Sequence, residues 1–297
     1  MRAAGFRLDV VYPADEPHTA VLSAGKETLR LTRPGASPLP QDLPPFEPDF
    51  VLTKAGATPR QGRAGMLYRD LIPSRLGGRY IASHISIPEG APVADWVHYH
   101  RIALQMIFVR RGWVRVVYEG QGEPFVMNEG DLVLQPPQIR HRVLESSSGL
   151  EVVEISAPAS HETLADHVMV LPNGHHPGQR FSGQRFLHHV AADTPWMPFK
   201  AAEVQETDMF EVTGGLADVS VIRAGAASEI AFRPHDGELV FGFVLAGSAS
   251  LDGSALGPAD AFAVPPDRTW TLTGLSKDFR LLHVTTGRLD AAARSRL

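Results

Sequence analysis

Two blocks of this chain repeat each other, and this repeat limits the fold more than any other feature of the sequence. Residues 243–247 (FVLAG) follow the pattern of residues 108–112 (FVRRG), 135 positions later. Residues 260–266 (DAFAVPP) follow residues 131–137 (DLVLQPP), 129 positions later. Internal repeats of this kind predict two copies of one structural unit.

The repeated unit has the pattern of a β domain. A third match aligns residues 281–284 (LLHV) with residues 152–155 (VVEI). From Tyr80 onward, apolar runs alternate with turns rich in Gly and Pro, as strands and their connections do. The strands expected in the first copy are residues 81–87, 102–109, 113–118, 132–134 and 150–155. The 27 glycines and 24 prolines favour short strands over long helices, so the sequence predicts an all-β chain.

The segments outside the repeat are less regular. Residues 6–31 alternate in strand fashion and predict a hairpin or a pair of arm strands, too short for a domain of their own. Six prolines between positions 34 and 48 predict a stiff, extended linker. Short helices are expected at residues 161–167 and at residues 289–297.

Composition excludes several classes of function. The chain has no cysteine, so disulfides, thiolate metal sites and cysteine nucleophiles are excluded. The formal charge is −5 and no basic stripe stands out, which argues against a nucleic-acid partner. No apolar run approaches the roughly 18 residues of a membrane span, and the N-terminus lacks the apolar core of a signal peptide. We therefore expect a cytoplasmic protein with neither a membrane nor a nucleic acid as partner.

Three histidines have the spacing of a metal site on two neighbouring strands. His98 and His100 are two residues apart, so on a strand both project from the same face. His141 lies about forty residues later, beyond several Gly and Pro turns, and can reach that face from an adjacent strand. The pattern predicts that the three imidazoles bind one metal ion.

These residues resemble the two motifs of the cupin superfamily, and the repeat resembles its two-barrel (bicupin) members. The matching positions are His98, His100, Gln105 and Gly112 in the first motif, and Gly130, Pro136 and His141 in the second. The resemblance implies two cupin barrels (double-stranded β-helix, jelly-roll-like) in one chain with an N-terminal strand arm. The expected domains are residues 1–56 (arm and Pro-rich linker), 57–172 (barrel 1, with the metal site) and 173–297 (barrel 2).

The resemblance also implies the ligand set, with one departure. His98, His100, Gln105 and His141 would hold one divalent metal ion, with Fe(II) expected and Zn, Mn or Ni as alternatives. Gln105 stands where the family has glutamate, and glutamine can bind a metal only through its neutral amide oxygen. A neutral ligand set leaves the full charge of the ion in place and favours an anionic, oxygen-bearing ligand. Where related enzymes use that glutamate as a proton acceptor, Gln105 cannot act.

By the same offsets, barrel 2 has other residues in the four ligand positions. They are Arg233, His235, Val240 and Trp270. One histidine cannot hold a metal alone, so we expect barrel 2 to be a degenerate copy that serves as scaffold or as a pocket lined by Arg233 and Trp270.

Two further residues are candidates for catalysis because they lie on expected barrel strands. His84 and Glu154 could act as general acid or base or hold the metal ligands in place. The alternative for both is a structural hydrogen bond in the barrel wall. No serine stands in a nucleophile elbow and no phosphate-binding glycine loop occurs, so we expect neither triad hydrolysis nor nucleotide chemistry.

The resemblance implies three classes of function. The first is an Fe(II)-type dioxygenase acting on a small oxygenated organic substrate, because a three-histidine face leaves positions for substrate and dioxygen. The second is a non-redox, metal-dependent isomerase, lyase or cyclase that uses the ion as a Lewis acid. The third is a small-ligand-binding cupin without catalysis. The arm could extend a sheet or cross to a neighbouring chain, so a homodimer is also an expectation.

Overall fold

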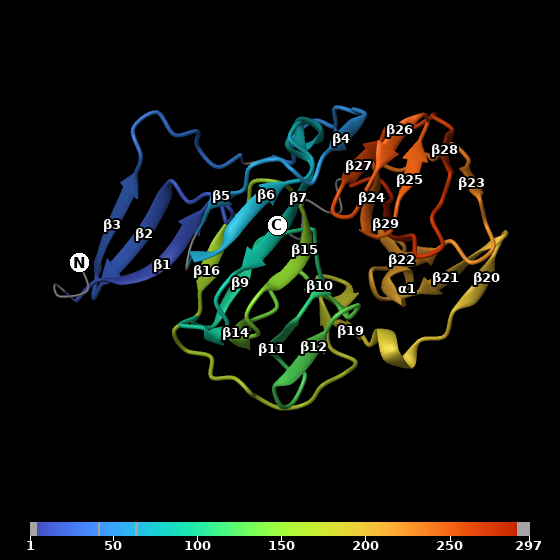
Figure 1. The fold of residues 1–297 in the computed structure, drawn as a ribbon. Coiled ribbons are helices and arrows are strands. Elements are labelled where there is room, and N and C mark those ends of the chain that lie inside the picture. Colours follow the sequence, from blue (N-terminus) through green and yellow to red (C-terminus); the bar gives the residue numbers. More distant parts are fainter. Residues whose placement is uncertain (1–4, 41, 63–64, 290–297) are drawn as a thin grey trace.

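The structure is a computed structural model that describes residues 5–40, 42–62 and 65–289. It is built almost entirely of antiparallel β-strands, arranged as two barrels side by side with a strand arm on the far side of the first barrel (Figure 1). The short α1 (Met209–Val212) is the one α-helix among the described residues. No helix in this part of the chain is long and apolar enough to cross a membrane. The predicted all-β, two-barrel architecture is confirmed.

Each barrel contains a seven-stranded sheet, and the two sheets have the same strand order. The first runs β19 (Leu187–His189), β13 (Leu132–Leu134), β10 (Leu104–Arg111), β15 (Leu150–Ala157), β7 (Ile81–Ile87), β6 (Leu67–Asp70) and β5 (Arg60–Gln61). The second runs β4 (Val51–Thr53), β27 (Ala261–Val264), β24 (Leu239–Ala246), β29 (Arg280–Thr286), β22 (Ala217–Arg223), β21 (Ala202–Glu206) and β20 (Met197–Phe199). The repeated sequence blocks therefore form equivalent strands: β13 and β27, β10 and β24, β15 and β29.

The first strand of each of these sheets comes from the other half of the chain. β19 lies beyond barrel 1 in the sequence but pairs with β13, and β4 precedes barrel 1 but pairs with β27. Equivalent aspartates anchor both strands: Asp131 accepts a hydrogen bond from Ala191 N (2.9 Å), and Asp260 accepts one from Ala55 N (2.7 Å). The two halves thus exchange strands reciprocally. The predicted boundaries at residues 56/57 and 172/173 stay predictions.

A second sheet closes each barrel. In barrel 1 its order is β12 (Phe125–Asn128), β11 (Trp113–Tyr118), β14 (His141–Ser146), β9 (His98–His100), β16 (Thr163–Ala165), β1 (Arg7–Tyr12), β2 (Thr19–Ala24) and β3 (Glu27–Thr32), with β8 (Ala91–Pro92) also pairing with β14. In barrel 2 it is β23 (Glu229–Phe232), β28 (Trp270–Thr273), β25 (Ala249–Leu251) and β26 (Ser254–Leu256). β17 (Arg180–Phe181) and β18 (Gln184–Arg185) form a separate hairpin.

The N-terminal arm extends the second sheet of barrel 1. It has three strands, and β1 pairs with β16. The helix predicted at residues 161–167 is wrong, because β16 forms there and pairs with β9 on one side and β1 on the other. Hydrogen bonds to these two strands satisfy the backbone N–H and C=O groups of a segment that is too short to form a stable helix alone. Of the helix predicted at residues 289–297, residues 290–297 lie outside the described part of the chain.

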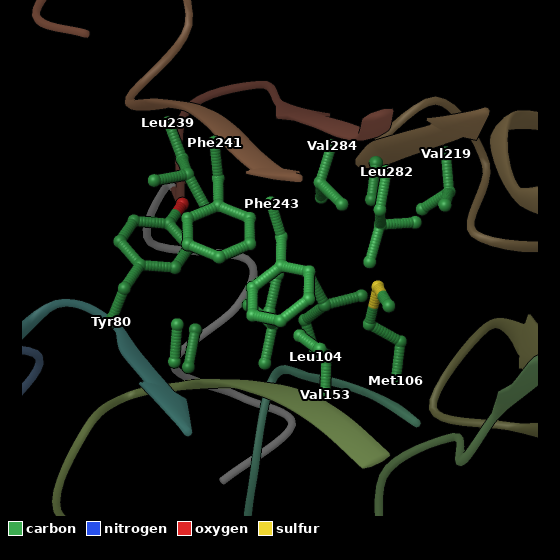
Figure 2. Close-up of a cluster of buried hydrophobic side chains, with 14 of the residues drawn as sticks. Tyr80, Leu104, Met106, Val153, Val219, Leu239, Phe241, Phe243, Leu282 and Val284 are labelled. Atoms are coloured by element: carbon green, nitrogen blue, oxygen red, sulfur yellow. The ribbon is translucent and has the colours of Figure 1, made fainter. Parts of the chain in front are cut away.

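The main hydrophobic core lies between the two barrels. Tyr80, Leu104, Met106 and Val153 of barrel 1 face a set of apolar side chains of barrel 2, as Figure 2 shows. That set includes Val219, Leu239, Phe241, Phe243, Leu282 and Val284. Side chains alternate along a strand, so the residues next to these core residues in the sequence point into the barrel interiors. The seven-stranded sheets are therefore buried on both faces, and the barrel interiors receive Gln105 from β10 and Val240 from β24.

Candidate metal centre

The three predicted histidines converge inside barrel 1. β9 carries His98 and His100, and its neighbour β14 places His141 directly opposite His98. One ligand nitrogen of each ring lies within 4.8 Å of the other two, and all three side chains are buried. The ring centroids are 4.3 to 5.4 Å apart. This cluster could hold a divalent metal ion.

Hydrogen bonds at Nδ1 orient each of the three rings. His98 Nδ1 lies 2.8 Å from the Trp96 carbonyl oxygen, and His141 Nδ1 lies 3.0 Å from that of Ile139. His100 Nδ1 lies 3.1 Å from the Thr163 hydroxyl, across the β9–β16 pair. Partners of this kind fix the tautomer and the orientation of metal-binding histidines. An ion would therefore be bound through Nε2 of each ring.

Gln105 lies in the same cavity with its two amide atoms in different environments. Its side chain is 2% exposed. Nε2 donates a hydrogen bond to Glu154 Oε1 at 3.2 Å, while Oε1 is buried and has no hydrogen-bond partner among the described residues. Leaving a buried acceptor unpaired is unfavourable. An amide oxygen of this kind suits a divalent cation or a ligand bound to one, so the residues present fit a metal.

Glu154 is one of three carboxylates that line this cavity, with Asp15 and Asp95, and Asp95 Oδ1 lies 3.5 Å from His98 Nδ1. Glu154 lines the same cavity as the three histidines and accepts hydrogen bonds from Gln105 and from the Ser156 hydroxyl, the latter at 3.3 Å. These contacts hold one carboxylate oxygen in a defined position. Glu154 thus lies where it could exchange a proton with a molecule bound in the cavity.

The cavity above the histidines has a volume of about 170 Å³ and mostly apolar walls. Isoleucine and valine side chains from both sheets form much of the apolar lining, including Ile81, Ile85, Ile107, Val114, Val116 and Val152. Tyr118 packs against His141 with ring centroids 5.5 Å apart, and its burial, with the nearby charge of Glu154, raises the pKa of the phenol far above its usual value. The cavity thus combines apolar walls with a polar group at the three histidines that includes Gln105, Glu154 and His161.

His84, the other predicted catalytic residue, does not join this group. It lies on β7 between Ser83 and Ile85, which line the cavity, so its side chain projects from the opposite face of the sheet. There its Nε2 lies 2.8 Å from Glu151 Oε2, and its ring lies 5.6 Å from that of Phe243 in barrel 2. Burial, assisted by Arg69, lowers the pKa of His84. It belongs to the contact between the barrels.

The structure adds one residue that the sequence analysis did not select. His161 lines the cavity, and its ring centroid lies 5.4 Å from that of His100. Burial lowers the pKa of His161, although the Pro158 carbonyl and the Asp15 carboxylate act in the opposite direction. The sequence did contain a signal for this residue, because His161 and Thr163 are two residues apart, as side chains on one face of a strand are. The signal could be used only if the segment was expected to be extended, and we expected a helix.

Aromatic side chains fill the equivalent position in barrel 2. Trp270 on β28 lies opposite Phe232 on β23, and the two rings stack with their centroids 3.8 Å apart. His141 and His98 are paired in the same way in barrel 1. Phe232 therefore occupies the position that the sequence offsets assigned to Arg233, which is exposed one residue further on. Val240 and His283 stand where barrel 1 has Gln105 and Glu154.

Two barrels with equivalent seven-stranded sheets form the fold that the resemblance to two-barrel cupins predicts, and the three-histidine cluster lies in one of them. Among solved structures with this fold is oxalate decarboxylase from Bacillus subtilis at pH 4.6, with a TM-score of 0.58 and 11% sequence identity over 83% of this chain and 78% of that chain. A second structure of the same enzyme, from work on its Mn(II) centres, matches with a TM-score of 0.58 and covers 79% of that chain. At this identity the similarity concerns the fold. No family model and no curated protein matches the sequence.

Proposed function

We propose that this protein is a metal-dependent cupin enzyme, an Fe(II) dioxygenase that acts on a small oxygenated organic substrate. The observation that carries the proposal is the group of three buried histidines with ligand nitrogens within 4.8 Å of one another, at the wall of an apolar cavity. Imidazole nitrogens that converge from neighbouring strands form a donor set that divalent transition metals bind.

The donor set supports a site that keeps most of the charge of its ion. His98, His100 and His141 are neutral when they bind a metal, and the amide oxygen of Gln105 is neutral as well. An Fe(II) ion held there would supply redox chemistry with dioxygen and polarise a substrate oxygen. The remaining positive charge favours a substrate that binds through an anionic oxygen.

The other residues of the cavity determine what surrounds the reacting atoms. The isoleucine and valine walls exclude water and pack against the apolar part of a substrate. Gln105 cannot accept a proton. Asp15 is paired with Arg75, and Asp95 accepts a hydrogen bond from Val143 N beside His98. Glu154, held by Gln105 and Ser156, is therefore the carboxylate that we assign to taking up or returning a proton in this cavity.

A second candidate is a non-redox metal enzyme: an isomerase, lyase or cyclase. The position of Glu154 favours it, because proton transfer next to a polarised oxygen is sufficient for such reactions. The similar fold of oxalate decarboxylase, whose Mn(II) centres are the subject of one of the structures above, is compatible with a lyase. Here the bound metal would be Mn or Zn.

Metal analysis followed by oxygen uptake tests the two candidates. Protein purified without chelators is assayed for metal and then for oxygen uptake with diketones, catechols and hydroxy acids. Iron together with oxygen uptake supports the dioxygenase, whereas zinc or manganese with turnover but no uptake supports the second candidate. His141→Ala is the inactive reference, and His167→Ala, outside the cavity, is the matched control. Wild-type protein without metal would refute both candidates and leave the ligand-binding alternative.

A further inference from the structure

His161 presents a buried nitrogen without a partner to the cavity. The side chain is 3% exposed and lies in the loop between β15 and β16. Its Nδ1 lies 3.0 Å from the Pro158 carbonyl oxygen, while Nε2 is buried and has no hydrogen-bond partner among the described residues. Because a carbonyl oxygen can only accept, Nδ1 carries the proton. In the neutral ring, Nε2 is then a hydrogen-bond acceptor.

His161 lines the cavity beside the three-histidine cluster but is not a member of it. Its ring stands edge-on to His100 at 5.4 Å, but the group of nitrogens within 4.8 Å of one another contains only His98, His100 and His141. His161 is therefore next to the predicted ligand set and outside it. The backbone occupies the Nδ1 edge of the ring, so Nε2 is the atom that can meet a ligand.

The N-terminal arm supports this wall of the cavity. The turn between β1 and β2 docks on the loop of His161, where Ala14 N donates to the His161 carbonyl oxygen at 3.1 Å. Next to it, Asp15 also lines the cavity. Its Oδ2 accepts a hydrogen bond from Arg75 at 2.9 Å, and its Oδ1 is buried without a partner among the described residues. This side of the cavity thus offers hydrogen-bond acceptors.

We propose that His161 is a specificity-determining residue whose Nε2 accepts a hydrogen bond from a hydroxyl group of the substrate. The substrate class is then a small hydroxylated chelator, such as a 2-hydroxy acid, in preference to the corresponding 2-oxo acid. This inference rests on the proposed function, because the ion at the three histidines holds the other end of the substrate. A buried acceptor that meets no donor disfavours the analogue that lacks the hydroxyl.

The size of the cavity selects the probes. A volume of about 170 Å³ is close to the roughly 150 Å³ of an engineered apolar cavity that binds benzene. Mandelate and phenylglyoxylate each combine one phenyl ring with a two-carbon chelating group. They differ only in a hydroxyl against a keto oxygen, so they isolate the hydrogen bond that His161 would accept.

Titration calorimetry with zinc-loaded protein tests the inference, with metal content and thermal stability measured in parallel. Wild-type protein should bind mandelate about tenfold or more tightly than phenylglyoxylate. His161→Phe should bring the two dissociation constants to within about twofold, with metal content unchanged. His161→Gln keeps an acceptor and should restore part of the difference. His167→Phe, on an exposed residue outside the cavity, should behave as wild type.

The outcomes separate this inference from the proposed function. Equal affinities in the wild type, or binding of neither probe by protein that holds zinc, would overturn the role of His161 and leave the metal centre intact. A preference that persists in His161→Phe, or a loss in it that His161→Gln does not partly recover, would do the same. Wild-type protein that fails to bind zinc would overturn the proposed function and this inference with it.

Discussion

Gln105 donates a hydrogen bond from its side-chain amide to Glu154, with Nε2 and Oε1 3.2 Å apart across the adjacent strands β10 and β15. This contact turns the amide nitrogen of Gln105 toward the carboxylate of Glu154. The amide oxygen is therefore the end that can bind a cation. A glutamate in place of Gln105 would set two carboxylates against each other. The neutral residue at this position is therefore coupled to the presence of Glu154.

Gln105→Glu should destabilise the metal-free protein and strengthen its metal binding. Two facing carboxylates raise the pKa of one of them, so the destabilisation is absent below the pKa of the unfolded chain and appears as the pH rises. We expect a loss of about 1–3 kcal/mol at pH 7 and metal binding tighter by about tenfold or more. Denaturant unfolding at pH 4 and pH 7, with and without zinc, measures both effects.

The exchange variant Gln105→Glu/Glu154→Gln is the matched control. It restores one carboxylate and one amide to the pair, so the stability of the metal-free protein should recover. If the single variant were as stable as wild type at pH 7, the contact between these two side chains would not constrain the site.

Metal affinity should depend on Thr163 as well as on the histidines. His141→Ala removes one ligand and should abolish metal retention while the fold remains, because the main core lies between the barrels. Thr163→Val keeps the shape of the side chain but removes the hydroxyl beside His100 Nδ1, and should weaken metal binding about 10–100-fold. Competition with a chelator measures both affinities. Unchanged affinity in Thr163→Val would mean that the hydroxyl does not orient His100.

The sequence was sufficient for the parts of this site that depend on strand periodicity. His98 and His100 share a face because alternate residues of a strand do, and the repeat indicated which strands are equivalent. Contacts between distant segments were not predictable. Nothing in the three-residue strand β4 indicates that it pairs with barrel 2, and β16 looked helical because its two neighbouring strands come from remote parts of the chain.

The sequence also could not predict the alignment of equivalent positions in the two barrels to within one residue. The offset of 135 residues holds for β10 and β24, and that of 129 for β15 and β29. In the segment before β24 the offset changes by one, so Phe232 and not Arg233 takes the position of His98. His161 was missed for a related reason, since its position depends on residues 163–165 forming the strand β16 instead of a helix.

Asp260 should stabilise the exchanged strand β4 in a pH-dependent manner. Burial alone would raise the pKa of this carboxyl, but hydrogen bonds from Lys54, Gly257 N and Ala55 N outweigh it and hold the pKa below its usual value. A lowered pKa means that the stabilisation is present above the pKa of the unfolded chain and is lost as the pH falls through that of the folded state.

Asp260→Asn should therefore lower the free energy of unfolding by about 1–3 kcal/mol at pH 7, and the difference from wild type should shrink toward pH 3. Urea unfolding across this range measures it, with Asp236→Asn on an exposed residue as the control. If the loss in the free energy of unfolding did not depend on pH, it would come from the loss of a hydrogen-bond acceptor at this position and not from the loss of its charge.

His283 should make barrel 2 sensitive to mild acid. It stands at the position of Glu154, beside the stacked Phe232 and Trp270, with ring centroids 5.5 and 6.0 Å away. Burial, with a smaller contribution from His235, lowers the pKa of His283 from 6.5 to about 4. Between these two values the unfolded chain takes up a proton that the folded chain does not, so the folded state loses stability as the pH falls.

His283→Phe removes this titration and extends the aromatic cluster. Between pH 7 and pH 4.5 the wild type should lose about 1–3 kcal/mol more than the variant, a range set by a maximum of about 1.4 kcal/mol per pH unit for one group. Denaturant unfolding at several pH values gives both curves, and His18→Phe, on a half-buried histidine of the N-terminal arm, should follow the wild type. Parallel curves for wild type and His283→Phe would show that His283 is protonated in the folded state, which its place among the aromatic rings does not favour.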